Sequence, residues 1–167
     1  MKTLNRQQGQ TLIETAIILV LLLLIVFGIT EFARAWFTKN SLKNSARQGA
    51  RVAVVTPPSD LTASFDCINT TCPYNSNVVK NAVCCQPGIP KAPQYNTTCE
   101  LKCFHYDSGT TQEIPCNTII SNDYIKATVQ STFFFAIGGH RLTFLGMDIW
   151  PWPQSMPFSA DASMRYE

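Results

Sequence analysis

An uninterrupted apolar segment near the N-terminus constrains this chain more than any other feature. Between Glu14 and Glu31 stand sixteen consecutive uncharged residues, TAIILVLLLLIVFGIT, and a short polar stretch with Lys2 and Arg6 precedes them. A helix of that length extends roughly 24 Å, slightly less than the roughly 30 Å hydrocarbon core of a bilayer. The sequence therefore predicts a short membrane-spanning helix, assigned to residues 10–30, with membrane lipid around it.

Charges and cysteines divide the chain into two unlike parts. Residues 1–55 carry seven basic residues against two acidic ones, whereas residues 56–167 carry six against nine. All seven cysteines lie between Cys67 and Cys116, a density typical of an oxidising compartment. We therefore expect the part after the membrane segment to be extracytoplasmic. It has no cluster of Lys and Arg, so nothing in its charge indicates a nucleic-acid partner.

The apolar segment is predicted to begin a much longer helix. No proline occurs from Gln10 to Val55, and Pro57 and Pro58 follow at once. Proline cannot continue a helix because it lacks the backbone N–H, so these two residues mark the end of one helix of about 46 residues, roughly 69 Å long. Its second half, residues 31–56, is amphipathic. The apolar face on which we expect a globular head to pack comprises Ile29, Phe32, Ala33, Trp36, Phe37, Leu42, Ala46, Ala50 and Ala53.

The same half of the helix carries a line of positive charge, which we call the basic stripe: Lys39, Lys43, Arg47 and Arg51. Residues four apart lie on one side of a helix. The stripe is either a solvated face, or a surface that meets acidic phospholipid or the acidic surface of a neighbouring subunit. Gly49 lies beside it and costs a helix about 1 kcal/mol relative to alanine, for which close helix packing is the compensation we expect.

Three kinds of N-terminal processing compete. Ala33, Arg34 and Ala35 form the small-x-small triplet of a secretory cleavage site, and an uncleaved signal anchor is the second alternative. Against both, a carboxylate in lipid such as that of Glu14 costs roughly 2.5 to 3.5 kcal/mol, which indicates a function. The third alternative is a basic leader that ends at Gly9, which would place Glu14 fifth in the mature chain and resembles a prepilin.

Four segments of the chain form a combined pattern. They are the leader ending at Gly9 with Glu14 after it, the Phe27–Arg34 block, the Ala46–Arg51 block, and the alternating ending Ser159–Glu167 with its Met-Arg-x-Glu signature. Together they resemble the TadE family, the pseudopilins of tight-adherence or Flp-type pilus systems. The resemblance covers residues 1–56 and 124–167. Residues 57–123 have no counterpart in the family pattern.

The resemblance implies specific site residues and partners. A prepilin peptidase would cut between Gly9 and Gln10, and the Glu14 carboxylate would pair with the new α-amino group of a neighbouring subunit. Glu31, Arg47, Gly49 and Arg51 would make helix contacts. Other pilin subunits and the pilus assembly platform would be the partners. The protein would lie in the bacterial inner membrane with its N-terminus cytoplasmic, and after assembly it would be located in the pilus or at the cell surface.

The predicted fold is α+β and pilin-like: a long N-terminal helix packed on a C-terminal antiparallel sheet, with a disulfide-rich loop region. Its parts are a leader at 1–9, the membrane half of the helix at 10–30, its continuation at 31–56, a cysteine-rich region at 57–123 and the sheet at 124–167. Within the sheet, apolar and polar residues alternate at 125–130 and 158–166, as in half-buried strands. Residues 133–150 fit either two further strands or a hydrophobic loop, and Pro151 and Pro153 must leave the sheet.

The cysteine-rich region is predicted to be cross-linked by disulfides, with three bridges and one free thiol as one arrangement of an odd number of cysteines. The candidates are Cys67, Cys72, Cys84, Cys85, Cys99, Cys103 and Cys116, and the sequence leaves their pairing open. A metal site of Cys99, Cys103 and His105 is the alternative. It is disfavoured because zinc sites use repeated pairs of ligands and no second pair of matching spacing follows.

The sequence has no phosphate-binding loop, no Gly-x-Ser-x-Gly and no histidine-rich motif. It therefore predicts no enzyme, cofactor or metal. The function that the resemblance implies is that of a minor pilin in the assembly, initiation or tip of an Flp-type pilus used in surface attachment. The alternatives are an uncleaved, signal-anchored, cysteine-rich adhesin or receptor, and a pseudopilin of a type II secretion system.

Overall fold

The computed structural model describes residues 7–61, 64–67, 77–107, 109–136, 143–144, 147–148 and 154–166, with side chains from Thr11 onward except at 143–148. The chain divides into two compact units, Met1–Ala35 and Trp36–Glu167. Helix and antiparallel sheet are both present, which confirms the α+β fold class.

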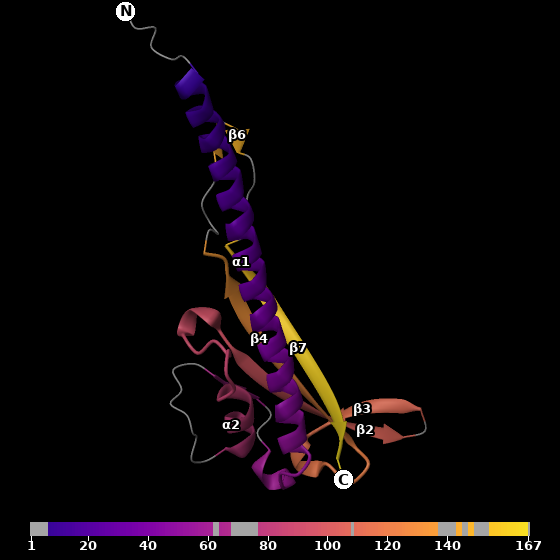
Figure 1. Ribbon diagram of the computed structural model, residues 1–167. Helices are drawn as coiled ribbons and strands as arrows, with labels where there is room; N and C mark the ends of the chain where they lie inside the picture. The colour runs from indigo at the N-terminus through magenta and orange to yellow at the C-terminus, as the bar shows by residue number, and fades with distance from the viewer. Residues whose placement is uncertain are drawn as a thin grey trace, which may run out of the picture. The chain divides into compact units, whose positions relative to one another are not determined.

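A single long helix, α1, opens the chain and runs from Gln7 to Ala53 over 47 residues, as predicted (Figure 1). It ends just before the two prolines. The Val54 N–H still donates to Ala50 O at 3.1 Å, and the Thr56 hydroxyl donates to Val52 O at 2.7 Å. Since Pro57 has no N–H to donate, the chain then leaves the helix.

In the first unit, the large apolar side chains from Leu12 to Ile29 are all exposed. By length and composition, this helix qualifies as a candidate membrane span. Exposed leucines and isoleucines on every side of a helix are unfavourable in water but suit a lipid surrounding.

The second unit is built on a five-stranded antiparallel sheet of order β1-β2-β4-β7, with β3 also paired to β2 (Figure 1). The strands are β1 (Ser64–Asp66), β2 (Thr98–Asp107), β3 (Thr110–Ile114), β4 (Tyr124–Phe134) and β7 (Ser155–Arg165). A separate pair joins β5 (Thr143–Phe144) to β6 (Met147–Asp148). The predicted strands at 125–130 and 158–166 thus form the β4–β7 pair.

Alternation along β4 gives the sheet its buried face. Ile125, Ala127 and Val129 are each 0% exposed, and their partners across β7 are Met164, Ala162 and Ala160. Phe133 continues this buried face and stacks on Phe158, with the ring centroids 5.5 Å apart. Within the described strands, β7 ends the strand order, and an edge strand is where a proline such as Pro157 is tolerated.

The cysteine-rich region holds more regular structure than the loops that its composition predicts. It supplies β1, β2 and β3 to the sheet, together with the short helix α2 (Val78–Cys84). The side chain of Asn77 caps α2 by accepting the Lys80 N–H at 2.8 Å. Three single-turn helices complete the second unit: η1 (Pro58–Asp60), η2 (Pro93–Tyr95) and η3 (Cys116–Thr118).

The core lies between the last turns of α1, helix α2 and the inner face of the sheet. On α1, the predicted apolar residues Leu42, Ala46, Ala50 and Ala53 are each 0% exposed. The prediction is wrong for the earlier part of that face: Ile29, Phe32, Trp36 and Phe37 are 57–69% exposed. Their spacing is helical, but the buried cluster on α1 begins only at Leu42. The predictions for Trp150 to Pro153 lie outside the described residues.

Candidate functional site

The predicted processing position lies inside α1. Gly9 and Gln10 have helical backbone, in the first turns of the helix that begins at Gln7. Glu14 stands about one turn beyond Gln10, and its side chain is exposed. Among the residues that the structure describes, no ion pair includes Glu14. A carboxylate on an otherwise apolar helix is costly in lipid unless a positive charge meets it, so Glu14 calls for a partner from outside this helix.

Glu31, the second acidic residue of the helix, is in a different situation. Its Oε1 lies 2.8 Å from Nη1 of Arg34, one turn along the same helix. The Glu31 side chain is only 14% exposed, against 51% for Arg34. Pairs spaced in this way stabilise a helix by roughly 0.2 to 0.5 kcal/mol. The described contact of Glu31 is therefore made within its own helix.

Gly49 lies where α1 crosses α2. A Cβ at this position would stand 2.5 Å from Cγ2 of Val83 and 3.8 Å from Cβ of Ala127. Nearby, the buried Ser45 hydroxyl donates to Val83 O at 2.6 Å. Small residues on this face let α2 and the sheet approach the α1 backbone closely. In the described structure, Gly49 therefore packs within the second unit, Trp36–Glu167, which we call the head.

The basic stripe is open to solvent along its whole length: Lys39, Lys43, Arg47 and Arg51 are all exposed. None of the ion pairs found among the described residues includes a member of the stripe. Neighbouring positive charges four residues apart destabilise a helix by a few tenths of a kcal/mol each. An acidic partner would remove that repulsion.

Two lysines on the sheet are in contrast paired with carboxylates of their own or a neighbouring strand. Lys102 Nζ lies 3.5 Å from a carboxylate oxygen of Glu100 and 3.5 Å from one of Glu113, and these charges raise the pKa of Lys102. Lys126 Nζ lies 3.3 Å from Asp161 Oδ2. These two lysines are thus compensated, whereas among the described residues the basic stripe on the helix is not.

Two disulfides fasten the cysteine-rich region to the sheet. Cys67, directly after β1, bonds to Cys84 at the end of α2, and Cys103 of β2 bonds to Cys116 of η3. Cys85 is also disulfide-bonded. The adjacent pair Cys84 and Cys85 therefore serves two different bridges. Each bridge of this loop length stabilises a fold by about 3 kcal/mol.

Among the cysteines that the structure describes, Cys99 is free, and it is buried at 1% exposure. The residues directly opposite it on β1 and β4 are Phe65 and Val129, so no cysteine is placed across from it. Burial, with a smaller contribution from the charge of Glu100, raises the pKa of the Cys99 thiol to about 12. The thiol is therefore protonated and unreactive at neutral pH.

The alternative metal site is not formed by these residues. Cys103 is committed to its disulfide, and Nδ1 of His105 lies 2.6 Å from Oδ1 of Asp123. The part of the chain that the structure describes contains no group of three or more His, Cys, Asp and Glu side chains that could hold a metal ion.

The pair of His105 and Asp123 was not foreseen from the sequence, since 17 residues separate them in the chain. The Asp123 side chain is 2% exposed and also accepts the Ile120 N–H, at 3.0 Å. The backbone of Asp123 accepts the Tyr166 N–H at 2.7 Å. This cluster ties β2, the turn before β4 and the end of β7 together.

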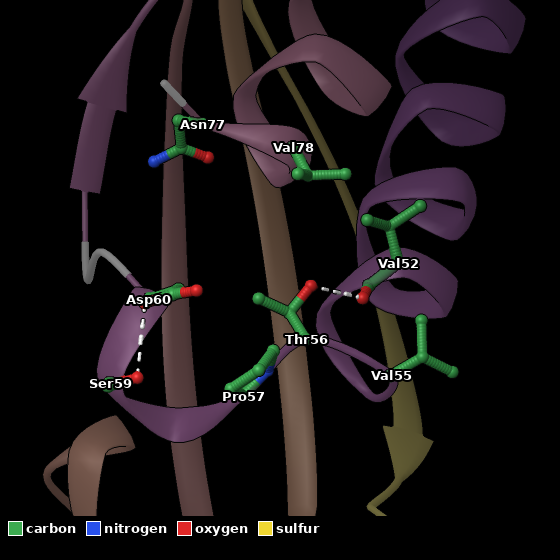
Figure 2. A pocket seen from close by; sticks show the side chains of 8 residues that line it. All are labelled: Val52, Val55, Thr56, Pro57, Ser59, Asp60, Asn77 and Val78. Atoms are coloured by element: carbon green, nitrogen blue, oxygen red, sulfur yellow. Dashed lines mark hydrogen bonds between the residues drawn. The ribbon is translucent and has the colours of Figure 1, made fainter. Parts of the chain in front are cut away.

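A shallow pocket lies where α1, η1 and the start of α2 meet, with a volume of about 490 Å³ (Figure 2). Its lining is Val52, Val55, Thr56, Pro57, Ser59, Asp60, Asn77 and Val78. Asp60 is the only ionisable residue in that lining, and the Ser59 hydroxyl donates to it at 3.1 Å. One carboxylate without a base, nucleophile or second acid offers no arrangement for catalysis.

Comparison with known families supports the resemblance for the N-terminal part of the chain. Residues 9–51 match the family model described as TadE-like protein, which confirms the resemblance seen in the sequence. The match starts at the predicted processing position and ends near the end of α1; residues 124–167 lie outside it. No curated protein and no solved structure matches the chain. Members of this pilin family are structural rather than catalytic proteins.

Proposed function

We propose that this TadE-like chain is a minor pseudopilin of a tight-adherence, Flp-type pilus. The observation that carries the proposal is the coincidence of the family match with α1: it covers residues 9–51, and the helix runs from Gln7 to Ala53. The shared part of the chain is therefore the helix that such subunits use to assemble. On this proposal residues 1–9 are a leader, and the bacterial inner membrane holds the protein before assembly, with the head extracytoplasmic.

The proposed assembly chemistry centres on the new N-terminus. A prepilin peptidase cuts between Gly9 and Gln10, which creates an α-amino group at Gln10. The Glu14 carboxylate of one subunit then pairs with the α-amino group of the next, where water is scarce and unlike charges attract strongly. The absence of an ion pair to Glu14 among the described residues supports this role.

The head contributes contacts rather than chemistry. Arg47 and Arg51 are exposed on the side of α1 that the sheet leaves open, and we assign them to the acidic surface of a neighbouring subunit or of the assembly platform. The disulfide-fastened region carries the contact surface at the pilus tip or base.

The start of the mature chain tests the proposal directly. Protein taken from its native membrane or surface fraction is examined by intact mass and N-terminal sequencing. A start at Gln10 supports prepilin processing. A start at Met1 would instead indicate a signal-anchored adhesin, and a start at Trp36 a secreted head. Either of these two results would overturn the pilin mechanism.

Charge removal at Glu14 tests the pairing step. We expect Glu14→Gln to leave membrane insertion and cleavage intact but to abolish recovery of the protein in sheared pilus fractions, because the α-amino group loses its counter-charge. The matched control is Glu113→Gln, which removes an exposed carboxylate on the sheet while Lys102 keeps Glu100 as its partner. Equal loss of assembly in both variants would argue against a specific role for Glu14.

A further inference from the structure

Two aromatic side chains stand exposed at the start of the head. Trp36 and Phe37 are 57% and 61% exposed, although large aromatic residues contribute most to stability when buried. The next basic residues, Lys39 and Lys43, are exposed as well and form no described ion pair. A tryptophan followed by lysines is the composition of a membrane–water interface, where the ring sits among headgroups and the ammonium groups reach phosphate.

The head holds this surface in a fixed position. Gly88, with φ at +82°, comes so close to α1 that a Cβ there would meet Oγ of Ser41 and would stand 2.8 Å from Cε1 of Phe37. Thr38 and Ser41, on the same side of the helix, are 9% and 8% exposed. One edge of the Phe37 ring therefore packs on the loop after α2 while the remainder faces outward. Phe37 therefore belongs to the folded head, and Trp36 directly precedes it on α1.

We propose that Trp36, Phe37, Lys39 and Lys43 form a docking surface for anionic phospholipid, at the level where the helix leaves the bilayer. We call this surface the collar, and its proposed role depends on the membrane insertion that the proposed function assumes. Charge complementarity selects an anionic lipid: the side chains exposed on α1 between Trp36 and Ala53 include four basic residues and no acidic one. Each lysine close to an anionic surface strengthens association roughly fivefold.

The collar uses only half of the basic stripe. At 1.5 Å per residue, Arg47 and Arg51 lie roughly 12 and 18 Å beyond Lys39 along the helix. The potential of a charged membrane falls off within a Debye length of about 8 Å at physiological ionic strength. Lys39 and Lys43 are therefore the lipid half of the stripe, and Arg47 and Arg51 remain for a protein partner.

The experiment uses the full chain in vesicles, with Trp150→Phe and Trp152→Phe so that Trp36 is the sole tryptophan. Its fluorescence is quenched by nitroxide lipids that carry the label near the headgroup or deep in the acyl chain. The quenching lipid is either phosphatidylcholine or phosphatidylglycerol. Two charge-reversed variants, Lys39→Glu with Lys43→Glu and Arg47→Glu with Arg51→Glu, change the same number of charges on the same stripe.

We expect the shallow label to quench Trp36 more than the deep one, and phosphatidylglycerol to quench several-fold better than phosphatidylcholine at equal amounts. The Lys39 and Lys43 variant should lose this lipid preference, and the Arg47 and Arg51 variant should keep it. The proposal is overturned by stronger quenching from the deep label, by equal quenching from both lipids, or by equal effects of the two variants. The last result would assign the whole stripe to a protein surface.

Failure of the collar is distinguishable from failure of membrane insertion. Protein that does not float with the vesicles in a density gradient contradicts insertion and the proposed function together. Protein that floats with neutral phosphatidylcholine vesicles but shows no preference for phosphatidylglycerol contradicts the collar alone.

Discussion

At the scale of single residues, the absence of a side chain at Gly49 allows α1 and α2 to approach closely. Replacement by alanine gains about 1 kcal/mol of helix propensity, but the new methyl group meets Val83, which is 0% exposed and cannot move into solvent. Overpacking of a core costs roughly 1 to 3 kcal/mol. We expect Gly49→Ala to lower the free energy of unfolding by up to about 2 kcal/mol in chemical denaturation.

The control for Gly49→Ala is the same change in a Val83→Ala background. Truncation at Val83 removes the methyl groups that the new side chain meets, so alanine at position 49 should then be neutral or stabilising. An identical penalty in both backgrounds would show that the contact with Val83 is not the cause.

The buried thiol of Cys99 is expected to make the free energy of unfolding depend on pH. Its pKa is 9.0 ordinarily and about 12 in the folded protein, so between these values the unfolded chain has released the thiol proton while the folded chain retains it. The stability contributed by this site is complete below pH 9 and is lost as pH rises toward 12, by at most about 1.4 kcal/mol per pH unit. Urea unfolding across this range should show a shallower decline for Cys99→Ala than for the parent protein.

The same burial makes Cys99 slow to react. Iodoacetamide at neutral pH should leave the folded chain unlabelled and should label one thiol after denaturation without reduction, as counted by intact mass. Rapid labelling of the folded protein would contradict the burial of this side chain.

At the scale of elements, the two described disulfides should contribute alike. Cys67–Cys84 closes a sequence separation of 17 residues and Cys103–Cys116 one of 13, so the loss of either should cost about 3 kcal/mol on loop entropy. Paired alanine variants, each compared with the parent by thermal unfolding, measure both costs. These four cysteines are all buried. A much larger loss of stability for one pair would therefore show that its side chains also contribute to core packing.

Sequence reasoning recovered the elements that have a clean pattern. The helix was visible because proline is absent until Pro57, and β4 and β7 because apolar and polar residues alternate. Strand β2 was missed for a physical reason. Its inward residues Cys99, Leu101 and Cys103 alternate with outward ones, but cysteines taken only as cross-links hide the apolar half of that pattern. Strand β3 is exposed or nearly so throughout, and no alternation marks it.

The sequence offers candidate site residues of one kind only, because short-range and long-range features differ, and the roles of these residues stay predictions. Gly9, Glu14 and the basic stripe are local patterns that need no tertiary structure to be recognised. The contact of Gly49 with Val83 and the pair of His105 with Asp123 join residues distant in the chain. No local rule gives such contacts, since they depend on how the sheet and helices pack.

At the scale of the whole molecule, the head should fold without the apolar part of the helix. Every member of the buried cluster lies at or after Leu42, and Trp36–Glu167 forms one compact unit. We expect a fragment of residues 36–167, secreted into an oxidising compartment, to unfold cooperatively and to contain one free thiol. A fragment that lacks a cooperative transition would show that the membrane half of α1 stabilises the head.

The adjacency of Cys84 and Cys85 has a consequence for biogenesis. If Cys84 and Cys85 exchange their disulfide partners, each loop changes in length by only one residue. The loop-closure entropies of the native and mispaired isomers are therefore nearly equal. The packing of Cys84 into the core, at 0% exposure, favours the native isomer. Oxidation before that packing will trap mispaired chains, whose rescue depends on thiol–disulfide exchange. Yield in a heterologous host should thus follow disulfide-isomerase activity more closely than oxidising power.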